Sequence, residues 1–217
     1  ATSTIVAHFD DDVELNDPSV FERAVDHFLK RNTGAVALHQ LRPDGTSHHM
    51  QPGIAQSTSE VSHFIGCGFL VLRSAWMHAG GFEEAIGYYY DEIEFCIRLR
   101  TAGYRVIYDP AIRIVHHEDA RGRDWQRIHR IGTRNAIACA FKISPAAAAP
   151  IASIRYLMHY FRLQPGDFRG AATILAELPK LFRNLSPSRR MTWRELIAFR
   201  RLMQRPMPLE TTAAPLA

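Results

Sequence analysis

The sequence predicts an α/β fold followed by amphipathic helices at its C-terminal end, and two observations predict it. Up to about residue 145, apolar runs of strand length alternate with segments whose apolar residues recur at helical spacing, and after it only helical periodicity remains. The charge also changes, because residues 1–150 carry 15 basic and 18 acidic side chains whereas residues 151–217 carry 11 and 4. We therefore expect two domains, residues 1–145 and residues 146–217.

The first predicted elements are a buried strand over residues 4–9, a helix and a second strand. Asp17 as N-cap and Pro18 at the first helical position predict the start of the helix, and Gly34 lies just past its end. The apolar run Ala35–Leu41 predicts the second strand. The helix has apolar residues at helical spacing, namely Phe21, Ala24, Val25, Phe28 and Leu29.

Glycines interrupt the middle of the chain. The apolar run Val61–Leu72 contains Gly66 and Gly68, and glycine within a strand pattern often marks the close approach of a ligand or of another backbone. Tight sheet packing explains the same pattern. The other elements of the first domain are predicted helices at residues 75–79, 91–102 and 121–141, and predicted strands at residues 104–108 and 112–115.

Three consecutive carboxylates, Asp10, Asp11 and Asp12, follow the first predicted strand. A strand that ends in carboxylates presents them at the edge of a sheet, where open α/β folds bind their ligands. In an extended chain Asp10 and Asp12 point to one side and Asp11 to the other. That arrangement suits a divalent cation whose shell is completed by phosphates. A solvated acidic turn is the alternative interpretation.

A second acidic group opens the predicted helix at residues 91–102, directly after the aromatic run Tyr88–Tyr90. The positive end of a helix dipole stabilises carboxylates, which accounts for one or two of Asp91, Glu92 and Glu94 better than for all three. A carboxylate here suits a general base if burial or neighbouring negative charge raises its pKa.

Histidines and arginines supply further candidate ligands. His116 ends a predicted strand, where one imidazole can join two carboxylates in binding a divalent metal. His48 and His49 fall in a polar segment that we interpret as a solvated loop rather than a metal site. Four arginines at helical spacing can clamp diphosphate oxygens, although a solvated helix face is the commoner explanation. They are Arg123, Arg127, Arg130 and Arg134.

Residues 151–217 combine a net charge of +7 with amphipathic helices. Basic helices with large apolar residues on one face can lie in a membrane interface, so we predict peripheral membrane contact through this segment. Packing of these faces on the domain, or on a second subunit in a homo-oligomer, is the alternative. No nucleic-acid partner is predicted, because no aromatic stacking platform accompanies the arginines. The predicted apolar stripes contain Ile151, Ile154, Leu157, Met158 and Phe161, and then Ile174, Leu175, Leu178, Leu181, Phe182 and Leu185.

Thr192 and Glu195 form a predicted capping box at the start of the last helix. The sequence shows neither a signal-peptide pattern nor an apolar run long enough to span a bilayer. Its three cysteines are widely spaced and suggest no disulfide framework. We therefore expect a reducing, cytoplasmic compartment.

Taken together, these motifs resemble the inverting family 2 glycosyltransferases of the GT-A fold, especially the bacterial rhamnosyltransferase-like branch. The resemblance covers roughly residues 5–140 and lies in the order and spacing of motifs that are weak individually. The matching residues are Phe9–Val13; Gly66–Phe69 with Arg73; Gly80–Glu84; Tyr90–Arg100 with Ala102–Val106; Pro110 with Val115 and His116; and Arg134 with Asn135.

The resemblance implies a GT-A-type mixed sheet flanked by helices. Asp10 and Asp12 resemble the DxD pair, which binds Mg²⁺ or Mn²⁺ and through it the diphosphate of a nucleotide-sugar donor, and His116 resembles the additional metal ligand. Glu92 takes the position of the catalytic base. Asp91 stays a candidate, because this chain has Asp-Glu where the family often has Glu-Asp. The residues expected to contact the donor are Asp10, Asp11, Asp12, Gly66, Gly68 and Arg98.

The implied activity is transfer of a sugar from a nucleotide-diphosphate donor to an acceptor hydroxyl, and we expect a glycan acceptor that is lipid-linked or part of the cell envelope. The family usually has a nucleotide-binding segment before the DxD motif, whereas this chain begins in the strand that leads to it. We therefore expect an N-terminally truncated GT-A region. A non-catalytic fragment or partner-binding module that keeps the GT-A scaffold is the alternative.

Overall fold

The computed structural model describes residues 3–30, 32–53, 57–118 and 121–209. The chain divides into two compact units, and each is described by itself below. The first, here called the sheet unit, consists of Ala1–Arg73, Tyr104–Glu118 and Arg200–Ala217. The second, here called the helical unit, consists of Ser74–Gly103 and Asp119–Phe199.

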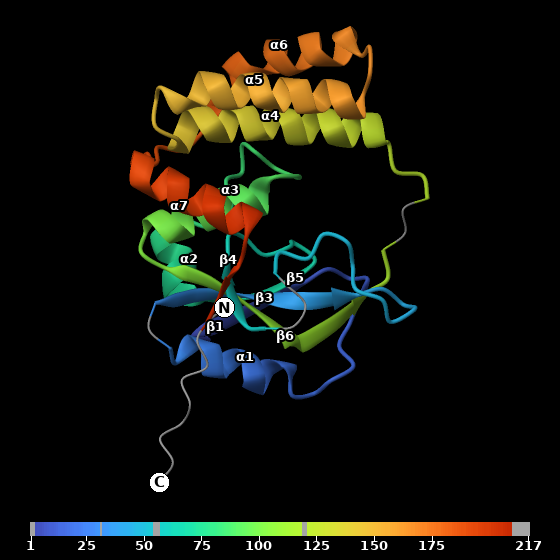
Figure 1. Ribbon diagram of the computed structural model, residues 1–217, viewed down its shortest axis with the longest axis vertical. Coiled ribbons are helices and arrows are strands. Elements are labelled where there is room, and N and C mark those ends of the chain that lie inside the picture. Colours follow the sequence, from blue (N-terminus) through green and yellow to red (C-terminus); the bar gives the residue numbers. More distant parts are fainter. Residues whose placement is uncertain (1–2, 31, 54–56, 119–120, 210–217) are drawn as a thin grey trace. The chain divides into compact units, whose positions relative to one another are not determined.

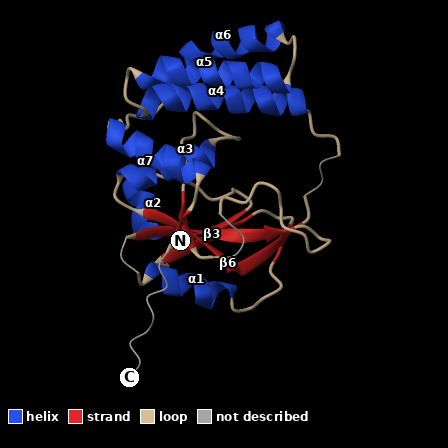
Figure 2. Ribbon diagram, viewed as in Figure 1, coloured by secondary structure: helices blue, strands red, loops and turns tan. Residues whose placement is uncertain are grey.

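The sheet unit contains one mixed sheet, drawn in red in Figure 2. Its strand order is β1-β5-β3-β6-β4-β7, and β2 pairs with β6 outside this path. β3 and β6 pair in parallel, whereas the other pairs are antiparallel. The elements are β1 (Ile5–Phe9), β2 (Val13–Glu14), α1 (Val20–Phe28), β3 (Thr33–Leu41), β4 (Ser59–Val61), β5 (Gly68–Leu72), β6 (Arg105–His116) and β7 (Met207–Pro208).

The core of the sheet unit lies between α1 and the central strands. Val20 and Ala24 of α1 are fully buried against Leu38 of β3 and Ile114 of β6. Burying a side chain of the Val, Leu or Ile type stabilises the fold by about 1.5–3 kcal/mol, so a few such contacts anchor α1 to the sheet. The ends of β3 and β6 are thereby held in fixed register.

Two predictions for the start of the chain are wrong in detail. Among the described residues β1 pairs with β5 alone and lies at the edge of the sheet, so Ala7 and His8 are exposed rather than buried. The helix starts at Val20, because Asp17 accepts hydrogen bonds from the backbone N–H and the hydroxyl of Ser19 and closes a turn that precedes it. Part of the predicted apolar face of α1 is exposed as well, at Phe21, Val25 and Leu29.

Two further strand predictions differ from the structure. The run Val61–Leu72 does not form one strand, because β4 and β5 are separated by the turn that contains Gly66. Conversely, β6 is a single strand through Asp109-Pro110, because a register shift between Leu38 and His39 of β3 accommodates the irregularity. The short strand β7, which pairs with β4, was not predicted.

The helical unit contains a layer of α4, α5 and α6, which lie side by side in Figure 1. Ile137 of α4, Tyr160 of α5, and Ile174 and Leu178 of α6 share one buried cluster. The helices of this unit are α2 (Arg73–Ala79), α3 (Asp91–Thr101), α4 (Trp125–Ile143), α5 (Ala148–Leu163), α6 (Phe168–Asn184) and α7 (Trp193–Gln204), of which α7 continues into the segment that leads to β7. The predicted domain boundary at residue 145 remains a prediction, and in the structure α4 packs with the helices that follow this boundary.

The C-terminal helices confirm the capping box and show which apolar faces are covered. The N–H of Thr192 donates to the Glu195 carboxylate, and the N–H of Glu195 donates to the Thr192 hydroxyl. In α6 the predicted residues Ile174, Leu178 and Leu181 are buried. α5 buries Ala149, Ala152 and Tyr160, whereas Ile151, Ile154 and Met158 of its predicted stripe are exposed. Within the described residues, no helix has the length and apolar character needed to cross a membrane.

Candidate metal and catalytic site

A tight turn follows β1 and carries the predicted acidic motif. The N–H of Asp10 donates to the Cys67 carbonyl (3.0 Å), and the N–H of Val13 donates to the Asp10 carbonyl (3.3 Å). The chain then pairs with the end of β6, so that Val13 lies opposite His116. The N–H of His117 donates to the Asp12 carbonyl (2.9 Å), which holds the turn against this strand end.

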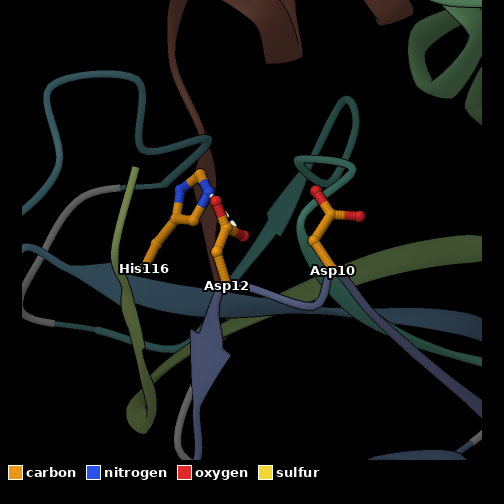
Figure 3. A group of neighbouring side chains, drawn as sticks. All are labelled: Asp10, Asp12 and His116. Carbon is orange, nitrogen blue, oxygen red and sulfur yellow. Dashed lines mark ion pairs between the residues drawn. The ribbon is translucent and has the colours of Figure 1, made fainter. Parts of the chain in front are cut away.

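This arrangement brings together the predicted ligands Asp10, Asp12 and His116 (Figure 3). Each offers one ligand atom, and the three atoms lie within 4.8 Å of one another. The turn between β1 and β2, rather than the alternation of an extended strand, produces the cluster. Asp11 lies in the same turn with an exposed side chain and is not part of the cluster, so its contact with the donor remains a prediction.

The cluster has the polar atoms that a divalent cation needs. Asp12 Oδ1 and His116 Nδ1 are buried atoms without a hydrogen-bond partner among the described residues. His116 Nε2 lies 3.3 Å from Asp12 Oδ1, a contact that lacks hydrogen-bond geometry. A buried polar group without a partner costs about 1–3 kcal/mol. The set of metal ligands, two carboxylates and one imidazole, therefore fits Mn²⁺ or Mg²⁺.

The surroundings of the cluster concentrate negative charge. Burial, together with the nearby carboxylates of Asp10, Asp12 and Glu118, raises the pKa of Cys67 to about 12. A bound cation would offset this negative field.

Two residues beside the cluster were missed as supporting residues. His48 Nε2 lies 3.0 Å from Glu118 Oε2, its Nδ1 accepts from the N–H of Met50, and its ring lies 6.2 Å from that of His116. His48 is buried, which contradicts its interpretation as a residue of a solvated loop. The paired histidines gave a signal, but nothing in the sequence linked them to Glu118, 70 residues away.

The two glycines predicted to contact the donor differ in their surroundings. A Cβ atom on Gly68 would lie 2.4 Å from Ile114 Cδ1, so close packing within the sheet explains this glycine. A Cβ atom on Gly66 would meet nothing within 4 Å. Donor contact by Gly66 therefore stays a prediction, whereas Gly68 is explained by packing.

In the helical unit, the predicted catalytic carboxylates Asp91 and Glu92 open α3 and are partly buried. Burial raises the pKa of Asp91 and Glu94 adds to this, whereas hydrogen bonds from the Glu92 side chain and from backbone N–H groups oppose it. Before them, Tyr89 (φ 67°) and Tyr90 (φ 73°) adopt the left-handed conformation. Such strain is of the order of 1–3 kcal/mol per residue and persists only where the surroundings hold it.

Asn135 of α4 holds this strained turn. Its fully buried Nδ2 group donates to the carbonyls of Ile86, Tyr88 and Tyr89, at 3.1, 3.1 and 2.7 Å. The resemblance includes Asn135, but the sequence alone suggested no role for this residue. In the structure Asn135 fixes the chain segment that leads into Asp91.

Arg98 belongs to a buried network of ion pairs and hydrogen bonds. It donates to both oxygens of Glu94 (2.8 and 2.6 Å) and to the carbonyls of Gly81 (2.6 Å) and Ala79. Lys142 Nζ contacts Glu94 (2.8 Å) and Glu83 (2.5 Å) in the same network. The guanidinium of Arg98 is thus buried and engaged by these partners, and its predicted contact with the sugar donor remains a prediction. The network also accounts for the carboxylate of Glu94.

Comparison with known proteins gives relatives by sequence and by fold, and no family model matches the chain. N-acetylglucosaminyl-diphospho-decaprenol L-rhamnosyltransferase of Mycobacterium tuberculosis is 32% identical over 80 residues, which are 36% of this chain and 26% of that protein. The O-antigen biosynthesis protein RfbC of Myxococcus xanthus is 24% identical over 147 residues, which are 57% of this chain and 12% of that protein. The match thus spans about a quarter or less of the length of these relatives.

Among solved structures, GalNAc-T7 with UDP, GalNAc and Mn²⁺ superimposes with a TM-score of 0.53 at 10% sequence identity. The match covers 93% of this chain and 40% of that chain, and it shows likeness of fold alone. The fold of this chain is therefore that of the GT-A glycosyltransferases. Its sequence is similar to that of a rhamnosyltransferase and of an O-antigen biosynthesis protein.

Proposed function

We propose that the protein that contains this chain is a metal-dependent inverting glycosyltransferase, which moves a sugar from a nucleotide-diphosphate donor to a lipid-linked or cell-envelope glycan. The cluster of Asp10, Asp12 and His116 carries the proposal, because its buried atoms without partners match the needs of a divalent cation. Mn²⁺ in the GalNAc-T7 structure supports the same metal class. The named acceptor of the mycobacterial relative, a diphospho-decaprenol, supports a lipid-linked acceptor.

Asp10, Asp12 and His116 would hold Mn²⁺ or Mg²⁺ together with the donor diphosphate. When bound, the cation supplies neutralisation of the charge that develops on the departing nucleoside diphosphate. His48 and Glu118 lie beside this cluster, and their hydrogen bond fixes the ring of His48 next to that of His116.

Glu92 or Asp91 takes the proton from the acceptor hydroxyl as general base, and that hydroxyl attacks the anomeric carbon on the face opposite the leaving group. Because its pKa is raised, the carboxylate of Asp91 is a stronger base than that of an ordinary aspartate. Asp91 therefore stands as an alternative to Glu92. Asn135 maintains the position of both by fixing the turn before α3.

A direct test of the base uses Glu92→Gln and Asp91→Asn with nucleotide-activated L-rhamnose and a short polyprenyl-diphospho-N-acetylglucosamine. General acid–base catalysis contributes about 10²–10⁴-fold, so loss of the base lowers turnover by that factor and leaves metal-dependent donor binding intact. Turnover retained in both variants contradicts the assignment. Absence of transfer and of metal-dependent donor binding in the unmodified chain favours the alternative of a non-catalytic scaffold module.

We also propose that α5 contributes a peripheral contact with an anionic membrane surface. Ile151, Ile154 and Met158 have exposed fractions of 60%, 60% and 54%, and their spacing places them on one face of the helix. Arg155 and Arg162 are exposed on the same helix. A helix with large apolar residues and flanking arginines favours the interface of an anionic bilayer.

A further inference from the structure

A cavity of about 460 Å³ in the helical unit lies between the strained tyrosine turn and the first half of α4. The rings of Tyr88 and Tyr89, whose centroids are 4.0 Å apart, form one part of the lining. Ile86, Ile128 and Ile131 supply further apolar lining. The cavity therefore offers apolar surface on both the turn and the helix.

Three guanidinium groups give the same cavity a positive charge. Arg123, Arg127 and Arg134 line it, and among the described lining residues Asp124 is the only carboxylate. Asp124 is engaged as the N-cap of α4, where it accepts from the N–H of Arg127. The cavity thus suits a ligand that combines an anionic group with apolar or ring surface.

The arginine at the far end of this row is fixed in place. Arg134 donates through Nε and Nη2 to Asn135 Oδ1 (3.1 and 2.9 Å) and through Nη1 to Glu177 (2.8 Å). Asn135 in turn holds the carbonyls of Tyr88 and Tyr89. One buried amide therefore ties the tyrosine lining and an arginine of the cavity into a preorganised unit, which lowers the entropic cost of binding.

We propose that this cavity binds the diphosphate of a polyprenyl-diphosphate-linked acceptor, with Arg123 and Arg127 contacting phosphate oxygens beside the fixed Arg134. Tyr88 and Tyr89 then cover the adjacent apolar or sugar portion of the ligand. The tyrosines directly precede Asp91, so a ligand anchored here lies next to the segment that carries the candidate base. This inference rests on the proposed function, since it assigns a site for the acceptor.

The donor nucleotide is the less suitable occupant of this cavity. A nucleotide-sugar diphosphate of the proposed kind is bound through a divalent cation, which needs several oxygen or imidazole ligands. The cavity offers one carboxylate, already used as a helix cap, and three guanidinium groups. Direct charge-assisted hydrogen bonds from arginine suit a diphosphate bound without metal.

The test measures binding of geranyl diphosphate to the full chain by isothermal titration calorimetry, with EDTA present so that the metal cluster makes no contribution. Arg123→Gln and Arg127→Gln each lower the affinity about tenfold or more, because each removes a charge-assisted contact. Arg130→Gln is the matched control, since Arg130 lies on the same helix and is not among the lining residues of the cavity. We expect this variant to bind geranyl diphosphate with the affinity of the unmodified chain.

The inference is overturned if the unmodified chain does not bind geranyl diphosphate, or if Arg127→Gln binds it with the affinity of the unmodified chain. It is also overturned if UDP in EDTA binds as tightly as geranyl diphosphate and its binding is equally sensitive to Arg127→Gln. In turnover assays the supporting result is a higher KM for the lipid acceptor in Arg127→Gln, with kcat and the donor KM unchanged. Failure of the proposed function looks different, because sugar transfer is then absent while arginine-dependent binding of geranyl diphosphate remains.

Discussion

Lys142 balances two buried carboxylates at once, those of Glu83 and Glu94. Burial alone would raise the pKa of Glu83, but the hydrogen bond from Lys142 and the positive charge of this lysine lower it below its ordinary value. The backbone N–H of Ser186 also donates to Glu83, so the network links α3, α4 and the segment after α6. The motif residues Glu83, Glu94 and Arg98 are explained by this structural network.

Lys142→Met should destabilise the fold by about 3–5 kcal/mol, because it leaves buried negative charge without its partner. Urea denaturation followed by circular dichroism measures the change. Lys180→Met is the matched control, since Lys180 is exposed on α6 and its loss should cost less than about 0.5 kcal/mol. A cost below about 1 kcal/mol for Lys142→Met would contradict the network.

Asp91 gives the stability a pH dependence of defined sign. Burial raises its pKa in the folded chain above the ordinary 3.8, so the folded state binds a proton more readily than the unfolded state. Its contribution to stability therefore decreases as the pH rises from about 3.8 through the raised pKa. Over this interval the unfolding free energy of the unmodified chain, measured by urea denaturation, should fall relative to that of the Asp91→Asn variant.

At this scale the sequence predicted which candidate metal ligands come together better than it predicted the residues beside them. Asp10, Asp12 and His116 could be predicted because strand ends and side-chain chemistry are both visible in sequence. The burial of His48 and the ion-pair network of Arg98 were not predicted, because burial and long-range partners decide the role of a charged side chain. Burial and long-range partners depend on tertiary packing, which the periodicity of the sequence does not reveal.

The helices and strands differ in how well sequence defines them. α3 agrees closely with its prediction, because Gly103 (φ 92°) ends it, and the capping box predicts the start of α7. β1 was predicted as buried because its apolar run does not reveal an edge position. β6 was predicted as two strands, because Asp109-Pro110 usually breaks a strand and the compensating register shift lies in β3.

α5 shows why an apolar stripe alone does not identify a buried face. Its buried side combines Ala149 and Ala152, which allow close approach to α4, with the ring of Tyr160, and Ile151, Ile154 and Met158 are left exposed. The arrangement supports the membrane proposal. Because α6 packs on α4, point substitutions test it better than deletion of residues 151–217.

Replacing Ile151, Ile154 and Met158 together by Ser should lower binding to vesicles of phosphatidylcholine and phosphatidylglycerol about tenfold or more, because three apolar side chains no longer enter the interface. Co-sedimentation measures the bound fraction. A control with Val25→Ser and Leu29→Ser removes exposed apolar residues from α1 and should bind as the unmodified chain does. Equal binding by the triple variant would rule out this face as the membrane contact.

At the scale of the whole molecule, the chain combines a sheet unit that carries the metal cluster with a helical unit that carries the candidate base and the arginine-lined cavity. The GT-A fold class could be predicted because the order and spacing of weak motifs extend over both units. The division into two interleaved units could not, because the chain leaves the sheet after β5, returns for β6 and returns again for β7.

The central claim is that Asp10, Asp12 and His116 hold a divalent cation with the donor diphosphate. Its most direct test is titration of Mn²⁺ into the full chain, with UDP present, while the electron paramagnetic resonance signal of free Mn²⁺ is followed. The account predicts one bound Mn²⁺ per chain, an affinity at least about tenfold lower in Asp12→Asn and His116→Ala, and no change in Asp26→Asn. Equal Mn²⁺ affinity in the unmodified chain and both site variants would contradict it.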